Sequence, residues 1–147
     1  MTPQTPRQGE VWVVKFDPTI GSEVRKTRPA LVVSADDIGL LPLRIVVPIT
    51  GWDEAYSNFP WFIPLPSNAA NGLVKPSAAD AFQIKSISKE RFVRGGLQGG
   101  RQGWCVRFVE RLGVITAAQF ASVVLAVITC LEPRDDLESP LSSLYSN

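Results

Sequence analysis

Two side chains at the ends of predicted strands could act on a phosphate ester. Arg28 precedes Pro29, which fixes its own φ and pushes Arg28 toward an extended conformation at the entrance of an apolar strand. Thr50 ends another apolar run. A guanidinium binds phosphate through two parallel hydrogen bonds and stays charged, and a hydroxyl can donate to a phosphate oxygen. Together they could stabilise the extra charge that develops when a 2′-hydroxyl attacks phosphorus in RNA.

Both residues also have ordinary structural roles open to them. Arg28 could form a surface ion pair with Glu23 or Asp17, and such exposed pairs contribute little to stability. The hydroxyl of Thr50 could satisfy nearby backbone groups where the strand ends. Spacing alone does not separate these roles from a catalytic one.

The composition excludes several other chemistries. The chain has no histidine, so nucleophile–base pairs of the Ser-His or Cys-His kind are absent. Cys105 and Cys130 are too few to hold zinc without histidine partners, and we expect neither a metal nor a cofactor. Two distant cysteines are typical of buried reduced thiols in the cytoplasm, with a disulfide as the alternative. The glycine-rich stretch 95–103 lacks the Gly-Lys-Ser/Thr ending of a phosphate-binding loop.

Aromatic residues gather shortly after Thr50. Phe59 and Trp61 are expected in the core, whereas Trp52 follows in a polar loop and is the better candidate for stacking on an unpaired base. A stacking face beside a phosphate-binding pair would suit single-stranded RNA.

Length and charge describe an ordinary globular domain. The 147 residues carry a net charge of +1 and are 45% hydrophobic, so any basic surface must be a local patch. The N-terminus has no apolar signal segment. The apolar run 115–131 contains Gln119 and Ser122 and is short for a membrane span, so we expect a cytoplasmic protein with no membrane partner.

The elements that must position Arg28 and Thr50 are mostly strands. Strands are predicted at 11–16, 30–34, 43–50, 61–65 and 77–87, with a short helical piece at Asp36–Asp37. The run 30–34 should be central and covered on both faces. Pro48 cannot donate to a ladder, so the strand 43–50 should end, bulge or lie at an edge there.

The second half of the chain predicts one helix. Ser88 should cap a single helical turn over 88–92, and 94–109 is a probable inserted glycine-rich loop. Thr116 and Gln119 have capping-box spacing and begin a helix that runs to about Leu131. This helix is apolar almost all round, which favours an oligomer or partner interface.

These elements indicate one α+β domain over residues 8–131, with flexible tails at 1–7 and 132–147. Short turns and the lack of βαβ alternation favour a small antiparallel barrel of about five to seven strands, with short peripheral helices and one C-terminal helix.

An ordered series of motifs resembles the MazF/PemK family of toxins. It begins with the segments Gly9–Thr19, Gly21–Glu23 and Thr27–Ser34. It continues with Val47–Thr50, Phe59-Pro60, Gly72-Leu73, Ala79-Asp80 and Gln83–Ser86, and resumes at Glu110–Gly113.

The resemblance implies an SH3-like barrel, a homodimer, and metal-independent, sequence-selective cleavage of single-stranded RNA. The products would be a 2′,3′-cyclic phosphate and a 5′-hydroxyl, and an acidic antitoxin protein would cover the RNA groove. Arg28 and Thr50 fall on the family's catalytic arginine and threonine. The positions that fall on or near its RNA groove are Phe16, Thr19, Glu23, Lys26, Ser77 and Gln83.

The chain departs from the family at three places. Gly51-Trp52 follows the threonine where a polar residue is common, the link at 94–109 is longer, and the last helix is less charged. Two rival functions therefore stay open. One is a CcdB-like gyrase poison, which acts by binding without catalysis. The other is a catalytically silent relic that binds RNA or antitoxin.

Overall fold

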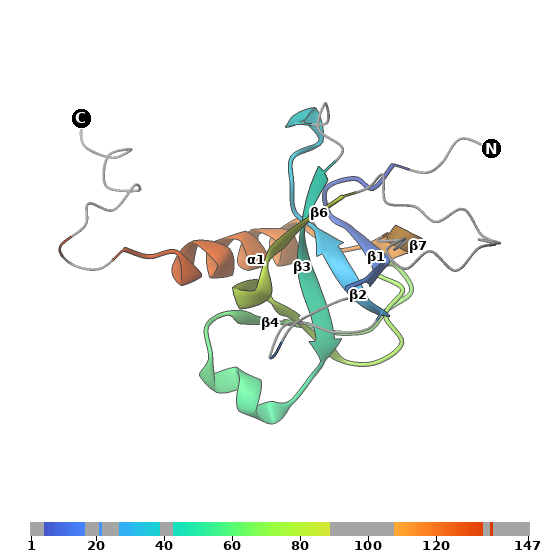
Figure 1. Cartoon of the computed structure of the whole chain (residues 1–147). Helices are drawn as coiled ribbons and strands as arrows, with labels where there is room; N and C mark the ends of the chain where they lie inside the picture. The colour runs from blue at the N-terminus through green and yellow to red at the C-terminus, as the bar shows by residue number, and fades with distance from the viewer. Residues whose placement is uncertain are drawn as a thin grey trace.

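The structure is a computed structural model, and it describes residues 5–16, 21, 27–38, 43–88, 108–133 and 136 (Figure 1). Seven strands precede one α-helix: β1 (Glu10–Lys15), β2 (Thr27–Val32), β3 (Leu43–Gly51), β4 (Phe62–Leu65), β5 (Ser77–Asp80), β6 (Lys85–Ser88), β7 (Phe108–Val114) and α1 (Ala117–Cys130). Three short 3-10 helices lie between strands: η1 (Asp36–Ile38), η2 (Glu54–Asn58) and η3 (Ala81–Gln83).

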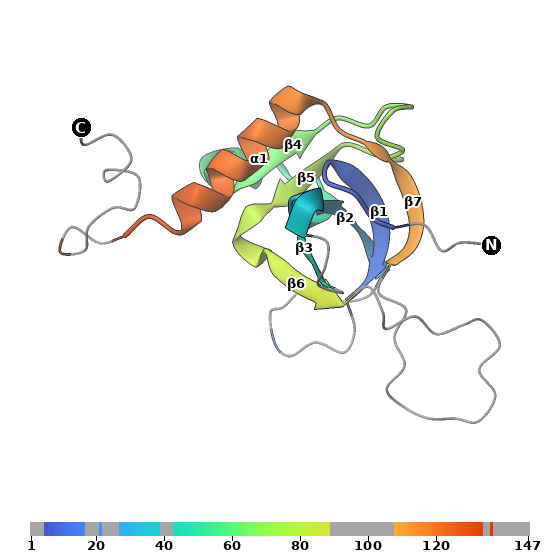
Figure 2. The same cartoon turned by 90° about the horizontal axis from the view of Figure 1, so that it is seen from above.

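All seven strands join one antiparallel sheet in the order β4-β5-β3-β2-β1-β7, and β6 also pairs with β3. The sheet curls strongly, and α1 lies across one side of it (Figure 2). The pairing of the described strands leaves the sheet open, so the barrel is not closed by hydrogen bonds. The predicted class, mainly antiparallel β with short peripheral helices and one C-terminal helix, is confirmed.

Strand β3 pairs with three other strands, and Pro48 lies within it. The strand was expected to end, bulge or lie at an edge at Pro48, but it continues to Gly51. On one side β3 pairs with β2. On the other it pairs with β6 up to Val46 and with β5 from Ile49 onward. Pro48 lies where β3 changes partner, and a missing backbone donor costs least at such a break.

Two apolar clusters fill the two faces of the curled sheet. One contains Val11, Leu31 and Val47 and extends to Val123 of α1. The other contains Trp12, Val14, Phe16, Ala30, Val32, Val46 and Ile87. Consecutive residues of β2 enter different clusters, as the alternation of side chains along a strand requires. The prediction that this strand is covered on both faces is confirmed, because its last three residues are fully buried.

The capping box at the start of α1 is confirmed. The hydroxyl of Thr116 accepts from the Gln119 backbone amide at 3.1 Å, and the Gln119 side chain accepts from the Thr116 amide at 3.0 Å. Only one side of the helix is buried in this chain, whereas Leu125 is 63% exposed. The expected oligomer or partner interface on α1 stays a prediction. None of the helices among the described residues has the length and hydropathy that a membrane crossing requires.

The single strand predicted over 77–87 was wrong. The segment divides into β5, η3 and β6, because a 3-10 turn at 81–83 redirects the chain so that β5 and β6 can pair with successive parts of β3. The imperfect alternation in this segment marked that break.

The two ends of the chain differ from the sequence expectations in one respect. Residues 1–7 were expected to form a flexible tail, but Pro6 is buried and its carbonyl accepts from Arg44 Nε at 3.0 Å. Gln8 is also held, because its backbone amide donates to Asp36 at 2.8 Å. Glu132, Pro133 and Asp136 are the described part of the predicted C-terminal tail.

Ser88, which was expected to cap a helical turn, is instead the last residue of β6. The rest of that predicted turn, at 89–92, lies outside the described residues, as do the loop at 94–107 and the thiol of Cys105. The last two residues of the predicted insertion, Phe108 and Val109, begin β7. The thiol of Cys130 is free and half-buried.

Candidate active site

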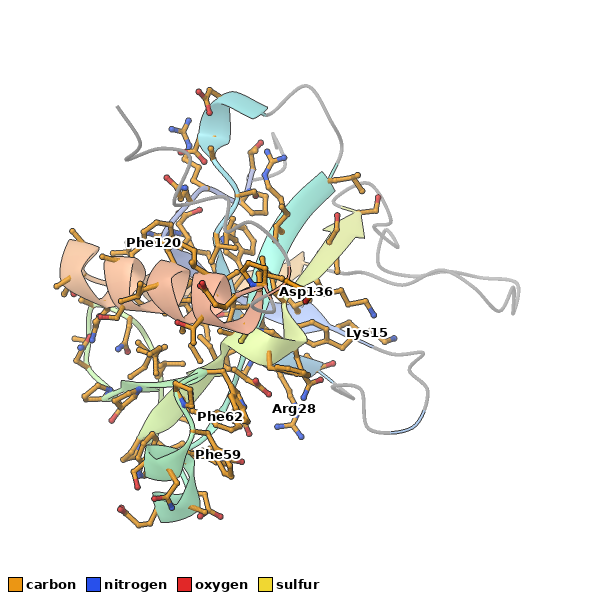
Figure 3. The ribbon with its side chains drawn as sticks, turned by 90° about the vertical axis from the view of Figure 1, so that its left-hand side faces the viewer. Lys15, Arg28, Phe59, Phe62, Phe120 and Asp136 are labelled. Carbon is orange, nitrogen blue, oxygen red and sulfur yellow. The ribbon has the colours of Figure 1, made fainter. Side chains whose placement is uncertain are left out.

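Arg28 is fixed near the start of β2. It lies opposite Val14 of β1, and its neighbours Thr27 and Pro29 lie opposite Lys15 and Val13. The pairing of β1 with β2 therefore fixes the backbone before and after Arg28. The side chain projects beyond the strand ribbons (Figure 3). A cation on this rigid strand can be directed at a bound group.

Thr50 faces Arg28 from the neighbouring strand. Strands β2 and β3 pair Ala30 with Pro48, and the same register continued by two residues brings Arg28 opposite Thr50. Arg28 Nη1 donates to Thr50 Oγ1 at 3.4 Å. Thr50 is itself held by pairing with Ala78 of β5. The two residues that sequence reasoning selected are therefore neighbours, although 22 positions separate them.

The geometry of this pair suits a shared acceptor. A donor–acceptor distance of 3.4 Å is long for a hydrogen bond, so the contact is weak. A phosphate oxygen about 2.8 Å from each donor would form a triangle with this 3.4 Å edge. The arrangement can therefore direct an N–H and an O–H at one developing negative charge.

Both residues line a cavity of about 400 Å³. Its lining brings together the start of β2, the end of β3 and the segment 72–77 before and at the start of β5, with Leu112 from β7. Among the described residues that line it, Arg28 and Lys75 carry positive charge and none is a carboxylate. The cavity is thus suited to an anionic ligand.

A hydrogen-bonded turn holds one wall of the cavity. Asn71 is 1% exposed, and its Oδ1 accepts from the backbone amides of Leu73 at 2.9 Å and Asn68 at 3.1 Å. Its Nδ2 donates to the Pro66 carbonyl at 2.7 Å. Gly72 follows with a φ of +70°, and a Cβ there would lie 2.2 Å from the Leu112 carbonyl oxygen. Only glycine permits this approach between the turn and β7.

The remaining predicted RNA-contacting residues are distributed unevenly. Ser77 is buried in the cavity wall, and its hydroxyl donates to the Lys75 carbonyl at 2.8 Å. Trp52 follows the cavity-lining Gly51 but does not itself line the cavity; it is half-buried, and its indole N–H donates to Glu54 at 3.1 Å. Gln83 does not line the cavity, and its amide donates to Asp80 at 3.1 Å.

Phe16 was expected at the RNA groove, but its side chain is 1% exposed and packs in the second apolar cluster. The alternation of β1 places it on the same face as Trp12 and Val14, so its ring fills the core and presents no stacking surface. Thr19, Glu23 and Lys26 lie outside the described residues.

An aromatic cluster extends from Trp52 along η2 and β4. Tyr56 stacks on Phe62 at 3.8 Å between ring centroids, and Phe59 stacks on Trp61 at 4.9 Å. Figure 3 shows Phe59 and Phe62 together beside η2. Core packing was expected for Phe59, yet this ring is 42% exposed, so the cluster lies at the surface.

Sequence reasoning missed Lys75, Asn71 and Asp80. The Asn-Gly dipeptide at 71–72 is typical of a turn, but it does not reveal the hydrogen bonds that Asn71 forms. Asp80 is 7% exposed, and its Oδ1 has no hydrogen-bond partner in the structure. Burial raises the pKa of the Asp80 carboxyl above its ordinary value, and the hydrogen bond from Gln83 offsets part of this effect. Burial also raises the pKa of the Cys130 thiol, and the nearby Asp80 charge adds to it.

No group of three or more Cys, Asp or Glu side chains in the described part of the chain is arranged to hold a metal ion. The groups that line the cavity and can contact an anion are cations and hydroxyls.

Comparison with known sequences is consistent with this geometry. The family model described as "PemK-like, MazF-like toxin of type II toxin-antitoxin system" matches residues 7–131. Endoribonuclease MazF9 of Mycobacterium tuberculosis is 38% identical over 94 residues, which are 60% of this chain and 77% of that protein. Endoribonuclease PemK of Escherichia coli is 43% identical over 44 residues, which span only 33% of that protein.

Solved structures share the fold. MazF from Deinococcus radiodurans superimposes with a TM-score of 0.66 at 22% identity, over 87% of this chain and 97% of that one. An endoribonuclease in complex with its cognate antitoxin, from a mycobacterial species, gives a TM-score of 0.59 at 16% identity, over 86% and 95% of the two chains. At these identities the likeness shows a common architecture.

Proposed function

Since the chain belongs to the PemK-like, MazF-like toxin family of type II toxin–antitoxin systems, we propose that it is an endoribonuclease that cuts single-stranded RNA. The observation that carries the proposal is the contact between Arg28 and Thr50 at the cationic cavity. Two relatives in the comparison are named endoribonucleases, and neither name specifies a cut sequence.

The proposed reaction is an internal transesterification. The ribose 2′-oxygen loses its proton and bonds to phosphorus, and the bond from phosphorus to the 5′-oxygen breaks as that oxygen gains a proton. The products are a 2′,3′-cyclic phosphate and a 5′-hydroxyl. Arg28 and Thr50 donate to the non-bridging oxygens, whose charge rises in the transition state. The chain has no imidazole, so the proton transfers use other groups.

Bases on either side of the cut would contact the cavity rim. Trp52 follows the cavity-lining Gly51 and offers an indole ring for stacking, and Ser77 contributes to the wall. We retain Gln83, Thr19, Glu23 and Lys26 as proposed RNA contacts on the family resemblance alone. Phe16 is left out because its ring is buried.

We further propose a homodimer that an acidic antitoxin segment inhibits by covering the cavity. Support for the antitoxin comes from a fold neighbour whose structure contains its cognate antitoxin. We place its action in the cytoplasm, where its RNA substrate would be.

The test is to incubate the purified protein with a long transcript in EDTA and to map fragment ends. We expect discrete fragments that end in cyclic phosphates. Arg28→Ala should slow cleavage by about 10²–10³-fold, the typical cost of losing one oxyanion donor, and Thr50→Val should also cause a large loss with the fold intact. Arg7→Ala, which removes a cation outside this cavity, should cut normally.

Each rival function has its own outcome. A protein that leaves RNA intact but inhibits gyrase would be a CcdB-like poison, and one that binds RNA without either effect would be a silent relic. If Arg28→Ala cuts as fast as the native protein, the assignment of the site is wrong even if the activity is confirmed.

A further inference from the structure

The segment before β5 contains a second cation of the cavity. Lys75 lines the cavity together with Arg28 and Thr50, and it is exposed to solvent. Its long stem leaves the ammonium free to approach a ligand, which suits contact with a phosphate as a point charge.

The backbone around Lys75 is fixed to the end of β3. The Lys75 carbonyl accepts from the Ser77 hydroxyl at 2.8 Å, and the next carbonyl, of Pro76, accepts from the Trp52 amide at 3.0 Å. Gly51 pairs with Ser77, and Thr50 pairs with Ala78. These hydrogen bonds therefore fix the backbone of Lys75 next to the end of β3, the strand that carries Thr50.

Gly51 provides the space for the lysine. A Cβ built on Gly51 would lie 3.2 Å from Lys75 Nζ and 3.3 Å from Cε. The ammonium thus lies over the backbone of the residue that follows Thr50. A larger side chain at position 51 would compete with the lysine for the same space.

We propose that Lys75 binds a phosphate of the RNA strand and so holds the substrate across the Arg28–Thr50 pair. This inference rests on the proposed RNA substrate. Arg28 acts on the charge that develops in the transition state, whereas Lys75 contributes equally to the bound substrate and to the transition state. Uniform binding of this kind affects affinity more than the rate of the bound complex.

Binding is measured with a 2′-O-methyl RNA, which lacks the free 2′-hydroxyl and cannot be cut. Lys75→Met should weaken its binding by about three- to tenfold at low salt, as expected for one exposed charge contact. The slope of log Kd against log salt concentration should fall by about 0.7, the value for one phosphate contact in a single strand. Lys75→Arg should restore most of the affinity and the slope.

Two further variants separate this role from general electrostatics and from structure. Arg7→Met removes one charge from another cavity and should leave Kd nearly unchanged. Gly51→Ala should displace the ammonium and weaken binding less than Lys75→Met does. The double variant should bind no more weakly than Lys75→Met alone, because both changes act through the same contact.

The inference is overturned if Lys75→Met binds within twofold of the native protein with an unchanged salt slope. That result leaves the nuclease proposal intact as long as the native protein cuts unmodified RNA. If the native protein binds RNA but does not cut it, the nuclease proposal fails, and the binding data alone decide the role of Lys75.

Discussion

Replacement of Asn71 by alanine should damage the cavity without touching a charged group. The substitution removes the acceptor for two backbone amides, of Leu73 and Asn68, and the donor to the Pro66 carbonyl. The Leu73 amide is buried, so leaving it unpaired should cost about 1–3 kcal/mol. The other two groups are partly exposed and should each cost about 0.5–1.5 kcal/mol because water can replace the lost partner.

The expected loss is therefore about 2–6 kcal/mol in the free energy of unfolding, a large part of the stability of a small domain. Urea unfolding followed by tryptophan fluorescence measures it, with an unchanged slope as the check on two-state behaviour. Asn68→Ala is the matched control, because within the described part of the chain the Asn68 side chain accepts only from the Asn71 amide, at 2.8 Å. This control should lose about 1 kcal/mol.

RNA binding should also be weakened by Asn71→Ala. The turn positions the residues from Gly72 to Lys75 that line the cavity, so Asn71→Ala should also weaken RNA binding under conditions where it remains folded. Equal losses of stability in Asn71→Ala and Asn68→Ala would refute the reasoning, because they would show that the buried amide of Leu73 finds another partner.

Three further predictions follow from the fold. Gly72→Ala should sharply reduce the folded yield, because the new Cβ would lie 2.2 Å from the Leu112 carbonyl oxygen. The control is Gly21→Ala, at a glycine with a similar positive φ but open space around it; its free energy of unfolding in urea should fall by only about 1 kcal/mol. Burial raises the pKa of Asp80 in the folded state above 3.8, so protonation of this carboxyl favours the folded state, and stability is lost as the pH rises through the raised pKa. Asp80→Asn should lack this loss and should be more stable than the native protein at neutral pH. The prediction fails if the stabilities of the two proteins, measured by urea unfolding, depend on pH in the same way. Thr116→Ala should lower the free energy of unfolding by about 1 kcal/mol through loss of the helix cap, and an unchanged urea midpoint would show that the cap contributes nothing.

Local patterns predicted most of the fold. The apolar and β-branched runs predicted β1 to β4 in approximate position, and the Thr116 capping box predicted the start of α1. The division of 77–87 was missed because it depends on which part of β3 each half pairs with, a tertiary property. The effect of Pro48 was misjudged for the same reason: a partner switch tolerates a missing donor, and sequence alone does not reveal where a strand changes partner.

Only part of the candidate site could be predicted from the sequence. Arg28 and Thr50 were found because strand ends and family motifs marked them, and the register of β2 and β3 explains their contact. Lys75 was missed because its role depends on Gly51 leaving space in another element. Phe16 was misplaced because a motif position does not tell which face of a strand is buried.

The pairing of β1 with β7 has a kinetic consequence. Arg28 and Thr50 come from strands that are close in the sequence, so their pairing closes a short loop. The β1–β7 ladder instead joins Glu10 to Val114 and supplies Leu112 to the cavity wall. Contacts of such long sequence separation form slowly. The cavity should therefore be completed last in folding, and a nascent chain should carry the Arg28–Thr50 pair before it has a finished place to hold RNA.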